Sequence, residues 1–158
     1  MCGRFILISD LSVITEIFGI LEVTCDYRPS SNVLPRHTIA ANGFYESMKE
    51  GKKKIPFYFR LKSGKPFGFA GLYETWTSPE GQSIHTCTII TTEPNDVIQS
   101  IHNRMPVIVP REKETSWIDP AVQDHTSISA VLRPYPSSEM EAFPLSSPKD
   151  LPIGYMAV

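Results

Sequence analysis

The chain has 158 residues, of which 41% are hydrophobic and 20% are charged, and its formal net charge is −2. These values are typical of a globular chain and predict one domain with a substantial core. The small negative charge excludes a field that draws the whole molecule to nucleic acid, and no apolar run approaches the roughly 20 residues that span a bilayer, so no membrane contact is expected.

The N-terminal part predicts a strand, a helix and a loop. Residues 3–8 are short and apolar and predict the strand. Apolar residues at helical spacing then predict a helix through residue 18, capped by Ser9 or Asp10. Prolines and serines predict a loop over residues 24–36. The first apolar stretch is too short for a signal peptide, so a cytoplasmic location is expected.

From residue 38 onward the pattern favours β-structure. The predicted strands, separated by turns rich in glycine, are 38–41, 44–46, 55–61, 67–73 and 84–92. The last of them is rich in β-branched residues and predicts a buried strand, so Cys87 is expected to be an inert core thiol. The lysines at 49–54 are expected to form a solvated hairpin tip.

The C-terminal part predicts short elements. Asn95 or Asp96 caps an expected helix that ends at residue 101, and prolines bound an expected strand at 104–110. Further helices are predicted at 111–118, with Trp117 on the buried side, and at 126–132. Residues 136–158 are rich in proline and serine and predict no element. The chain therefore predicts a β-dominated α+β domain with antiparallel strands and short helices at its edges.

The cysteines and histidines predict no disulfide framework and no metal site. The chain has three cysteines, an odd number, and shows no export signal. The four histidines are scattered, and no Cys or His pair has the spacing of zinc ligands. No metal and no other cofactor are expected.

The second residue can carry covalent chemistry. Removal of Met1 would leave Cys2 with a free α-amine and a thiol on adjacent carbons. Ordinary α-amines titrate near roughly 7.7–8.0 and thiols near roughly 8.5, so both groups are partly reactive at neutral pH. Such an aminothiol condenses with an aldehyde to an imine, which the thiol closes to a five-membered thiazolidine. Taken alone, Cys2 is more simply explained as an accident of the start site.

Two further residues suit acid–base chemistry. Glu46 follows Phe44 and Tyr45 in a predicted strand, and a carboxylate beside aromatic side chains is suited to transfer protons. His102 lies between a predicted helix and a strand bounded by prolines, and loops on rigid scaffolds commonly carry catalytic groups. Taken one at a time, an exposed strand-end carboxylate and a packed or capping histidine are simpler explanations.

Several motifs in order resemble one known family. They are Met-Cys-Gly-Arg-Phe at 1–5, Gly-Phe-Tyr-Glu at 43–46, Phe-Ala-Gly-Leu-Tyr-Glu at 69–74, Ile-Ile-Thr-Thr-Glu-Pro-Asn at 89–95, Ile-His-Asn-Arg-Met-Pro at 101–106, Leu-Arg-Pro-Tyr at 132–135 and Met-Glu-Ala-Phe at 140–143. Together they resemble the SRAP family (SOS response-associated peptidase), whose members are abasic-site sensors that crosslink to DNA. The resemblance covers most of residues 1–19 and 36–147 and implies an antiparallel, barrel-like sheet with short flanking helices.

The resemblance implies a role for individual residues. Cys2 matches the family residue that attacks the ring-opened aldehyde of an abasic site in single-stranded DNA, and Glu46 and His102 match the active-site Glu and His. The residues expected to bind DNA are Arg4, Thr91 and Arg104. An arginine near the reactive terminus can pair with a phosphate through two hydrogen bonds.

The chain also departs from the family. A long segment that usually follows the loop is missing around residues 33–37, and with it an active-site Asn, a phosphate-binding Arg and the tryptophans that wedge into DNA. Ser47 replaces a usual Trp, Asn103 stands where Asp is common, and the tail at 148–158 diverges. The resemblance thus implies one SRAP-like domain over residues 1–158 that is reduced by an internal deletion. Such a domain closes with a smaller sheet, associates with another copy through exposed sheet edges, or is a decayed paralogue.

Three functions follow from these observations. The first is a crosslinking or lyase enzyme of the DNA-damage and SOS response that links Cys2 to abasic single-stranded DNA. The second is a cysteine peptidase that uses Cys2 and His102 to process its own leader. The third is a non-catalytic module that binds single-stranded nucleic acid or a protein partner.

Overall fold

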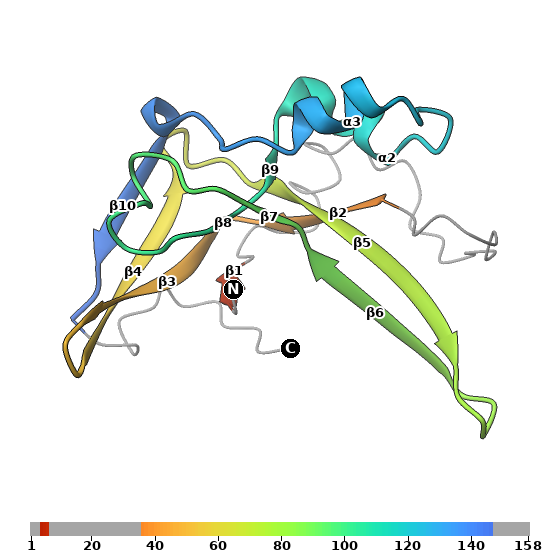
Figure 1. Ribbon diagram of the computed structural model, residues 1–158, viewed down its shortest axis with the longest axis horizontal. Coiled ribbons are helices and arrows are strands. Elements are labelled where there is room, and N and C mark those ends of the chain that lie inside the picture. The colour runs from red at the N-terminus through yellow and green to blue at the C-terminus, as the bar shows by residue number, and fades with distance from the viewer. Residues whose placement is uncertain (1–3, 7–35, 147–158) are drawn as a thin grey trace.

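The computed structural model describes residues 4–6 and 36–146 (Figure 1). Strands dominate this part of the chain, and every pairing between them is antiparallel. The predicted β-dominated α+β class is therefore confirmed, although the described sheets stay open and do not close into a barrel. The predicted helix up to residue 18 lies outside the described residues, as does the predicted loop at 24–36 except for Arg36, which begins a strand.

The first sheet has the strand order β1-β3-β4-β10. Its strands are β1 (Arg4–Ile6), β3 (Gly43–Glu50), β4 (Lys53–Leu61) and β10 (Met140–Pro144). β3 and β4 form a hairpin whose tip holds Gly51 at a φ of +60°, a conformation that glycine adopts without steric cost. The predicted lysine-rich tip is confirmed, because Lys49 and residues 52–54 are exposed.

The second sheet has the order β2-β5-β6, and β9 also pairs with β5. Its strands are β2 (Arg36–Ala41), β5 (Phe67–Thr77), β6 (Ser83–Ile89) and β9 (Ile108–Val109). A separate short pair joins β7 (Thr91–Thr92) to β8 (Met105–Pro106). The turn at Ser63-Gly64 connects the two sheets rather than two paired strands, because β4 and β5 belong to different sheets.

The two sheets share one aromatic core. Phe44 of β3 stacks on Phe59 of β4 with ring centroids 5.0 Å apart, and it meets the edge of Phe69 of β5 at 5.8 Å. All three rings are fully buried, together with Ile108 and Met140. We call the sheet faces that bound this core the inner faces. Burial of such rings is the main stabilising contribution to the fold.

Short helices cover the outer face of the second sheet. They are the 3-10 helix η1 (Arg111–Lys113), α2 (Glu114–Ile118), α3 (His125–Val131) and, beside β10, the 3-10 helix η2 (Ser137–Glu139). Trp117 of α2 is buried as predicted and packs with Ala70 and Val131 in a second core. Arg36 of β2 fixes the helix end, because its guanidinium donates to the carbonyl oxygens of Trp117, Asp119 and Val122 at 2.5–2.6 Å.

One glycine allows a close approach inside the first sheet. A Cβ on Gly43 would lie 2.3 Å from Cε2 of Tyr58 and 2.5 Å from the carbonyl oxygen of Phe59. Gly43 also pairs with Ile6 of β1. The close packing of β3 against β4 at this point therefore depends on the absence of a side chain.

The β5–β6 hairpin projects away from the core, as Figure 1 shows. Residues 83–88 of β6 are exposed, and Trp76 and Ile84 near the tip are 52% and 41% exposed. The prediction of a buried strand with an inert core thiol at Cys87 is wrong, because Cys87 is exposed. The cause is topological: β6 is the edge strand of its sheet, and the described residues place no further strand beside it.

Other differences from the prediction are local. Residues 96–101 form successive turns rather than a helix, and Val107 divides the expected strand at 104–110 into β8 and β9. β10 was not predicted, because it lies in a stretch rich in proline and serine. Within the described ranges, no helix is long and apolar enough to cross a membrane.

Candidate functional site

Glu46 lies on β3 with its side chain on the inner face. It shares this face with Phe44 and Met48, which lie two residues before and after it, and its register partner on β4 is Phe57. Only 9% of Glu46 is exposed, and its Oε1 atom is buried with no hydrogen-bond partner among the described residues. A buried acceptor without a partner is costly, and Oγ1 of Thr38 is a second such atom in the described part of the chain. A substrate, a ligand or a water molecule can supply the missing hydrogen bond to Glu46.

The N-terminal strand is held beside Glu46. β1 begins at Arg4, which pairs with Tyr45, and the strands run antiparallel. The N-terminal end of β1 is therefore the end next to Glu46. Cys2 itself lies outside the described residues, and Arg4 is described only through its backbone pairing, so their predicted roles stay predictions.

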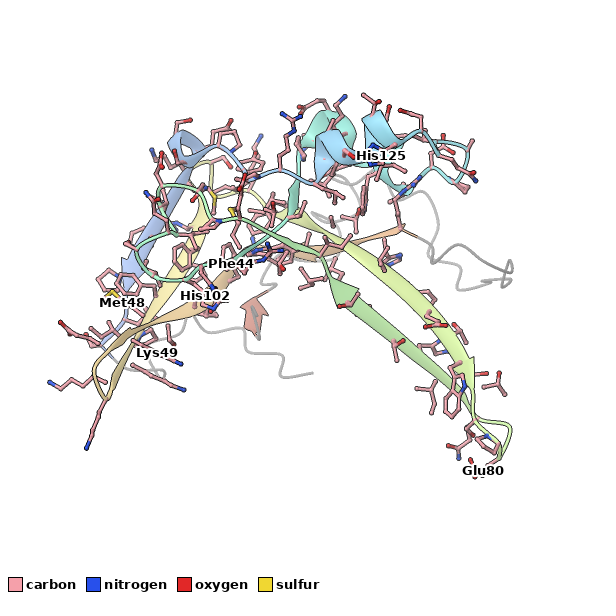
Figure 2. The ribbon with its side chains drawn as sticks, viewed as in Figure 1. Phe44, Met48, Lys49, Glu80, His102 and His125 are labelled. Atoms are coloured by element: carbon pink, nitrogen blue, oxygen red, sulfur yellow. The ribbon has the colours of Figure 1, made fainter. Side chains whose placement is uncertain are left out.

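His102 is anchored by the turns before it. The side-chain oxygen of Asn95 accepts from the backbone N–H groups of Val97 and Ile98 at 3.1 and 3.2 Å, and the N–H of His102 donates to the carbonyl of Ile98 at 2.9 Å. Ile98 and Ile101 pack into the aromatic core. Figure 2 labels His102 on the segment that precedes β8. Its hydrogen bonds among the described residues are to Ile98 and Arg104, and none joins it to Glu46.

The ring of His102 has one nitrogen engaged by the backbone. Its Nδ1 lies 3.1 Å from the N–H of Arg104 and 3.0 Å from the carbonyl oxygen of the same residue. Nδ1 can therefore accept in one tautomer and donate in the other. Nε2 has no hydrogen-bond partner within the described part of the chain, so this nitrogen can exchange a proton with a substrate.

Two of the predicted DNA-binding residues contact each other. The guanidinium of Arg104 donates to Oγ1 of Thr91, at 3.1 Å from Nη2 and 3.3 Å from Nε, and Nη2 also donates to the Thr91 carbonyl. The β7–β8 pairing brings these residues together across a 13-residue separation in the chain. No pattern in the sequence predicted this contact. Because the backbone of Arg104 also holds His102, one short segment orients a histidine ring and an exposed cation.

A second feature, a cavity of about 550 Å³, contains none of the predicted site residues. The cavity lies between the β4–β5 turn, η1, α2 and η2, and Glu114 and Tyr135 are among its lining residues. Burial raises the pKa of Glu114 to about 7, although Arg111 opposes this shift. Burial, followed by the nearby Glu139, raises the pKa of Tyr135 to about 12. Across the described residues, no three His, Cys, Asp or Glu side chains gather in a way that could hold a metal ion.

Comparison with known proteins identifies the family. The model for the SOS response associated peptidase (SRAP) matches residues 36–148. The chain belongs to the SRAP family. It is 47% identical over 116 residues to the abasic site processing protein YoqW of Bacillus subtilis (strain 168). This match covers 73% of this chain and 52% of YoqW. It is 26% identical over 119 residues to the abasic site processing protein HMCES of Gallus gallus, covering 63% of this chain and 35% of HMCES.

Solved structures agree with this membership. A protein from Bacteroides thetaiotaomicron superposes with a TM-score of 0.67 and 31% identity, covering 70% of this SRAP chain and 49% of its own. A protein from Bordetella bronchiseptica gives a TM-score of 0.63 and 26% identity, covering 72% and 56%. This SRAP chain thus spans about half the length of YoqW and of the two solved structures, and about a third of HMCES.

Proposed function

We propose that this SRAP chain processes abasic sites in single-stranded DNA by forming a covalent thiazolidine between Cys2 and the ring-opened sugar aldehyde. The observation that carries the proposal is Glu46, whose buried carboxylate has an atom without a partner and lies beside the start of the N-terminal strand. The shared name of the relatives, abasic site processing protein, supports the same substrate. We treat residues 1–158 as one SRAP-like domain that acts in the cytoplasm.

The proposed reaction needs no cofactor. The α-amine of Cys2, freed by removal of Met1, adds to the aldehyde carbon and gives a carbinolamine. Loss of the hydroxyl as water gives an imine, and the Cys2 thiolate then adds to the imine carbon while the nitrogen takes up a proton. The net change is one aldehyde and one aminothiol converted to one thiazolidine and one water.

Glu46 and His102 are the proposed proton carriers. A carboxyl group held among phenylalanines can donate the proton that lets the carbinolamine hydroxyl leave as water. Nε2 of His102 is unpaired among the described residues and can assist ring opening of the abasic sugar. This assignment gives the two steps to residues of different elements, Glu46 on β3 and His102 on the segment that precedes β8.

Arg104 is the proposed anchor for the DNA backbone. Its guanidinium is already oriented by Thr91, so less conformational freedom is lost when it binds a phosphate. We include Arg4 in the same role, because β1 brings the chain at this residue to β3. We also propose that the protein prefers single-stranded DNA to duplex DNA.

A second candidate is binding without crosslinking. It is favoured by the extent of the matches, which cover 52% of YoqW and 35% of HMCES, since residues that hold DNA in those proteins can lie outside the matched part. Peptidase activity confined to the chain's own leader remains a prediction. Intact-mass measurement in a host without methionine aminopeptidase would test it through loss of Met1.

The deciding experiment is a crosslinking assay. Wild-type protein, Cys2→Ala, Glu46→Gln and His102→Ala are incubated with an abasic oligonucleotide and separated on a denaturing gel. We expect a shifted band for wild type, none for Cys2→Ala, and rates lowered about 100-fold or more for Glu46→Gln, since acid–base groups contribute roughly 10²–10⁴-fold. Absence of the wild-type band, with single-strand affinity unchanged by Cys2→Ala, would favour binding without chemistry.

A further inference from the structure

Three ring side chains from three adjacent strands lie together on the second sheet. They are His37 of β2, Tyr73 of β5 and His85 of β6. The centroids of His37 and Tyr73 are 5.7 Å apart, and those of Tyr73 and His85 are 5.9 Å apart with planes inclined by only 14°. His37 and His85 are exposed and Tyr73 is half-buried. We call these three residues the ring row.

The ring row lies on the inner face, the same face that bounds the core beside Glu46. Tyr73 shares its strand face with Phe69, four residues earlier on β5, and Phe69 contacts Phe44 of the first sheet. Glu46 shares its own strand face with Phe44. The ring row therefore continues outward, along the projecting hairpin, from the core that Glu46 borders.

Hydrogen bonds fix the outermost ring. Nδ1 of His85 lies 2.6 Å from the hydroxyl of Tyr73 and 2.9 Å from Oγ1 of Thr75. Thr75 Oγ1 also lies 3.1 Å from the Tyr73 hydroxyl. The His85 ring is thus held in place before any ligand arrives, which reduces the entropy lost on binding.

The inner face of this hairpin carries no acidic residue. Its other members at the same strand positions are Thr75, Thr77, Ser83 and Cys87. Glu74 points to the opposite face, because it alternates with Tyr73 along β5. The cation of Arg104 is bound at Thr91, two residues beyond the end of β6. A polyanion therefore meets no like charge on this face and an oriented cation at its base.

We propose that the ring row is a stacking platform for unpaired bases of the single strand that flanks the abasic site. This inference rests on the proposed function and extends it from the reactive sugar to the neighbouring nucleotides. Exposed aromatic rings presented by a sheet bind bases without sequence preference, because every base offers a π-face. Bases within a duplex are already stacked, so the platform favours single strands.

The test measures reversible binding to undamaged DNA. In a Cys2→Ala background, the affinity for a fluorescent oligothymidylate is measured by anisotropy for the parent, His85→Ala, Tyr73→Leu and Tyr73→Phe. Loss of a ring is expected to weaken binding about five- to 100-fold, while Tyr73→Phe, which keeps its ring, stays near the parent. The matched control is Trp76→Ala, an exposed aromatic on the outer face of the same hairpin, which should bind like the parent.

The outcomes separate this inference from the proposed function. The platform is wrong, and the proposed function stands, if wild type crosslinks abasic DNA but the ring variants bind oligothymidylate like the parent. The same conclusion follows if Trp76→Ala loses as much affinity as the ring variants. If no crosslink forms while ring loss still weakens binding, the function is wrong and the platform stands. Circular dichroism of each variant checks that the hairpin is still folded. The stacking proposal would also be overturned if the ring variants lost as much affinity for a duplex of the same length as for the single strand.

Discussion

The two long hairpins of this chain differ in what lies beside them. β3 and β4 are both interior strands, flanked by β1 on one side and β10 on the other. Their inner-face rings Phe44 and Phe59 are fully buried, and Phe57 is partly buried. β5 is flanked by β2, β9 and β6, but β6 is an edge strand whose residues 83–88 are all exposed. Both hairpins nevertheless consist of β-forming residues with glycine at the tip.

The difference shows that neighbouring strands, rather than residue types, decide the burial of a strand. The segment around Cys87 is rich in β-branched residues and predicts a buried strand, yet Cys87 is exposed. Phe59 lies in a strand with no stronger β pattern, and it is completely buried. Substitutions in the two hairpins should therefore have very different costs.

The largest effect is expected at Phe59. Replacement by Ala would leave a cavity between Phe44 and the second sheet, and we expect a loss of about 3–5 kcal/mol in the free energy of unfolding. Urea denaturation followed by circular dichroism measures this loss. A cost below about 1 kcal/mol would mean that the shared core is not the main support of the fold.

An intermediate effect is expected at the half-buried Glu114. Its pKa is raised to about 7 in the folded protein, above the value of 4.5 for an unperturbed Glu, so the folded state favours the protonated form. The contribution of the protonated Glu114 carboxyl to the free energy of unfolding is complete below about pH 4.5, and it is lost as the pH rises through 7. Relative to wild type, Glu114→Gln should therefore gain stability as the pH rises, by no more than about 1 kcal/mol because water screens a half-exposed group.

Urea unfolding at several pH values measures this difference. The matched control is Glu80→Gln, since Glu80 is an exposed carboxylate at the tip of the distant β5–β6 hairpin (Figure 2). The interpretation fails if the two variants have the same pH dependence.

The smallest effect on stability is expected on β6. Ile84→Thr should change the free energy of unfolding by less than about 0.5 kcal/mol, because Ile84 is 41% exposed. Cys87 on the same strand should react with iodoacetamide in the native protein, which peptide mass spectrometry can localise. Protection of Cys87 until unfolding would show that another strand covers β6, and would remove the contrast between the hairpins.

The sequence predicted those features that depend on local chemistry. Trp117 lies on the buried side of a helix, as its spacing predicted. Gly51 and Gly81 have positive φ angles at turns that were predicted from these glycines. Residues 96–101 were expected to be helical, because Asn95 is a good helix cap. In the structure its side chain caps turns, while its amide donates to the distant carbonyl of Tyr135 at 2.7 Å.

Features that depend on distant pairing could not be predicted. β10 lies in a segment without a β pattern, and it forms because β4 offers an edge for it. The contact of Arg104 with Thr91 likewise needs the β7–β8 pair. For the candidate site, sequence motifs predicted that Glu46 and His102 are functional residues. Only the fold shows that Glu46 has a buried oxygen without a partner and that the backbone holds the ring of His102.

The absence of a side chain at Gly43 restricts which substitutions this position tolerates during evolution. Since even a methyl group there would collide with a ring and with a carbonyl that cannot move aside, position 43 is closed to ordinary point mutation. A lineage that loses this glycine would shift the start of β3, and with it the alignment of Glu46, three residues later, with β1. Among copies of this domain, retention of that one glycine would therefore indicate that the alignment of β3 with β1 is still under selection.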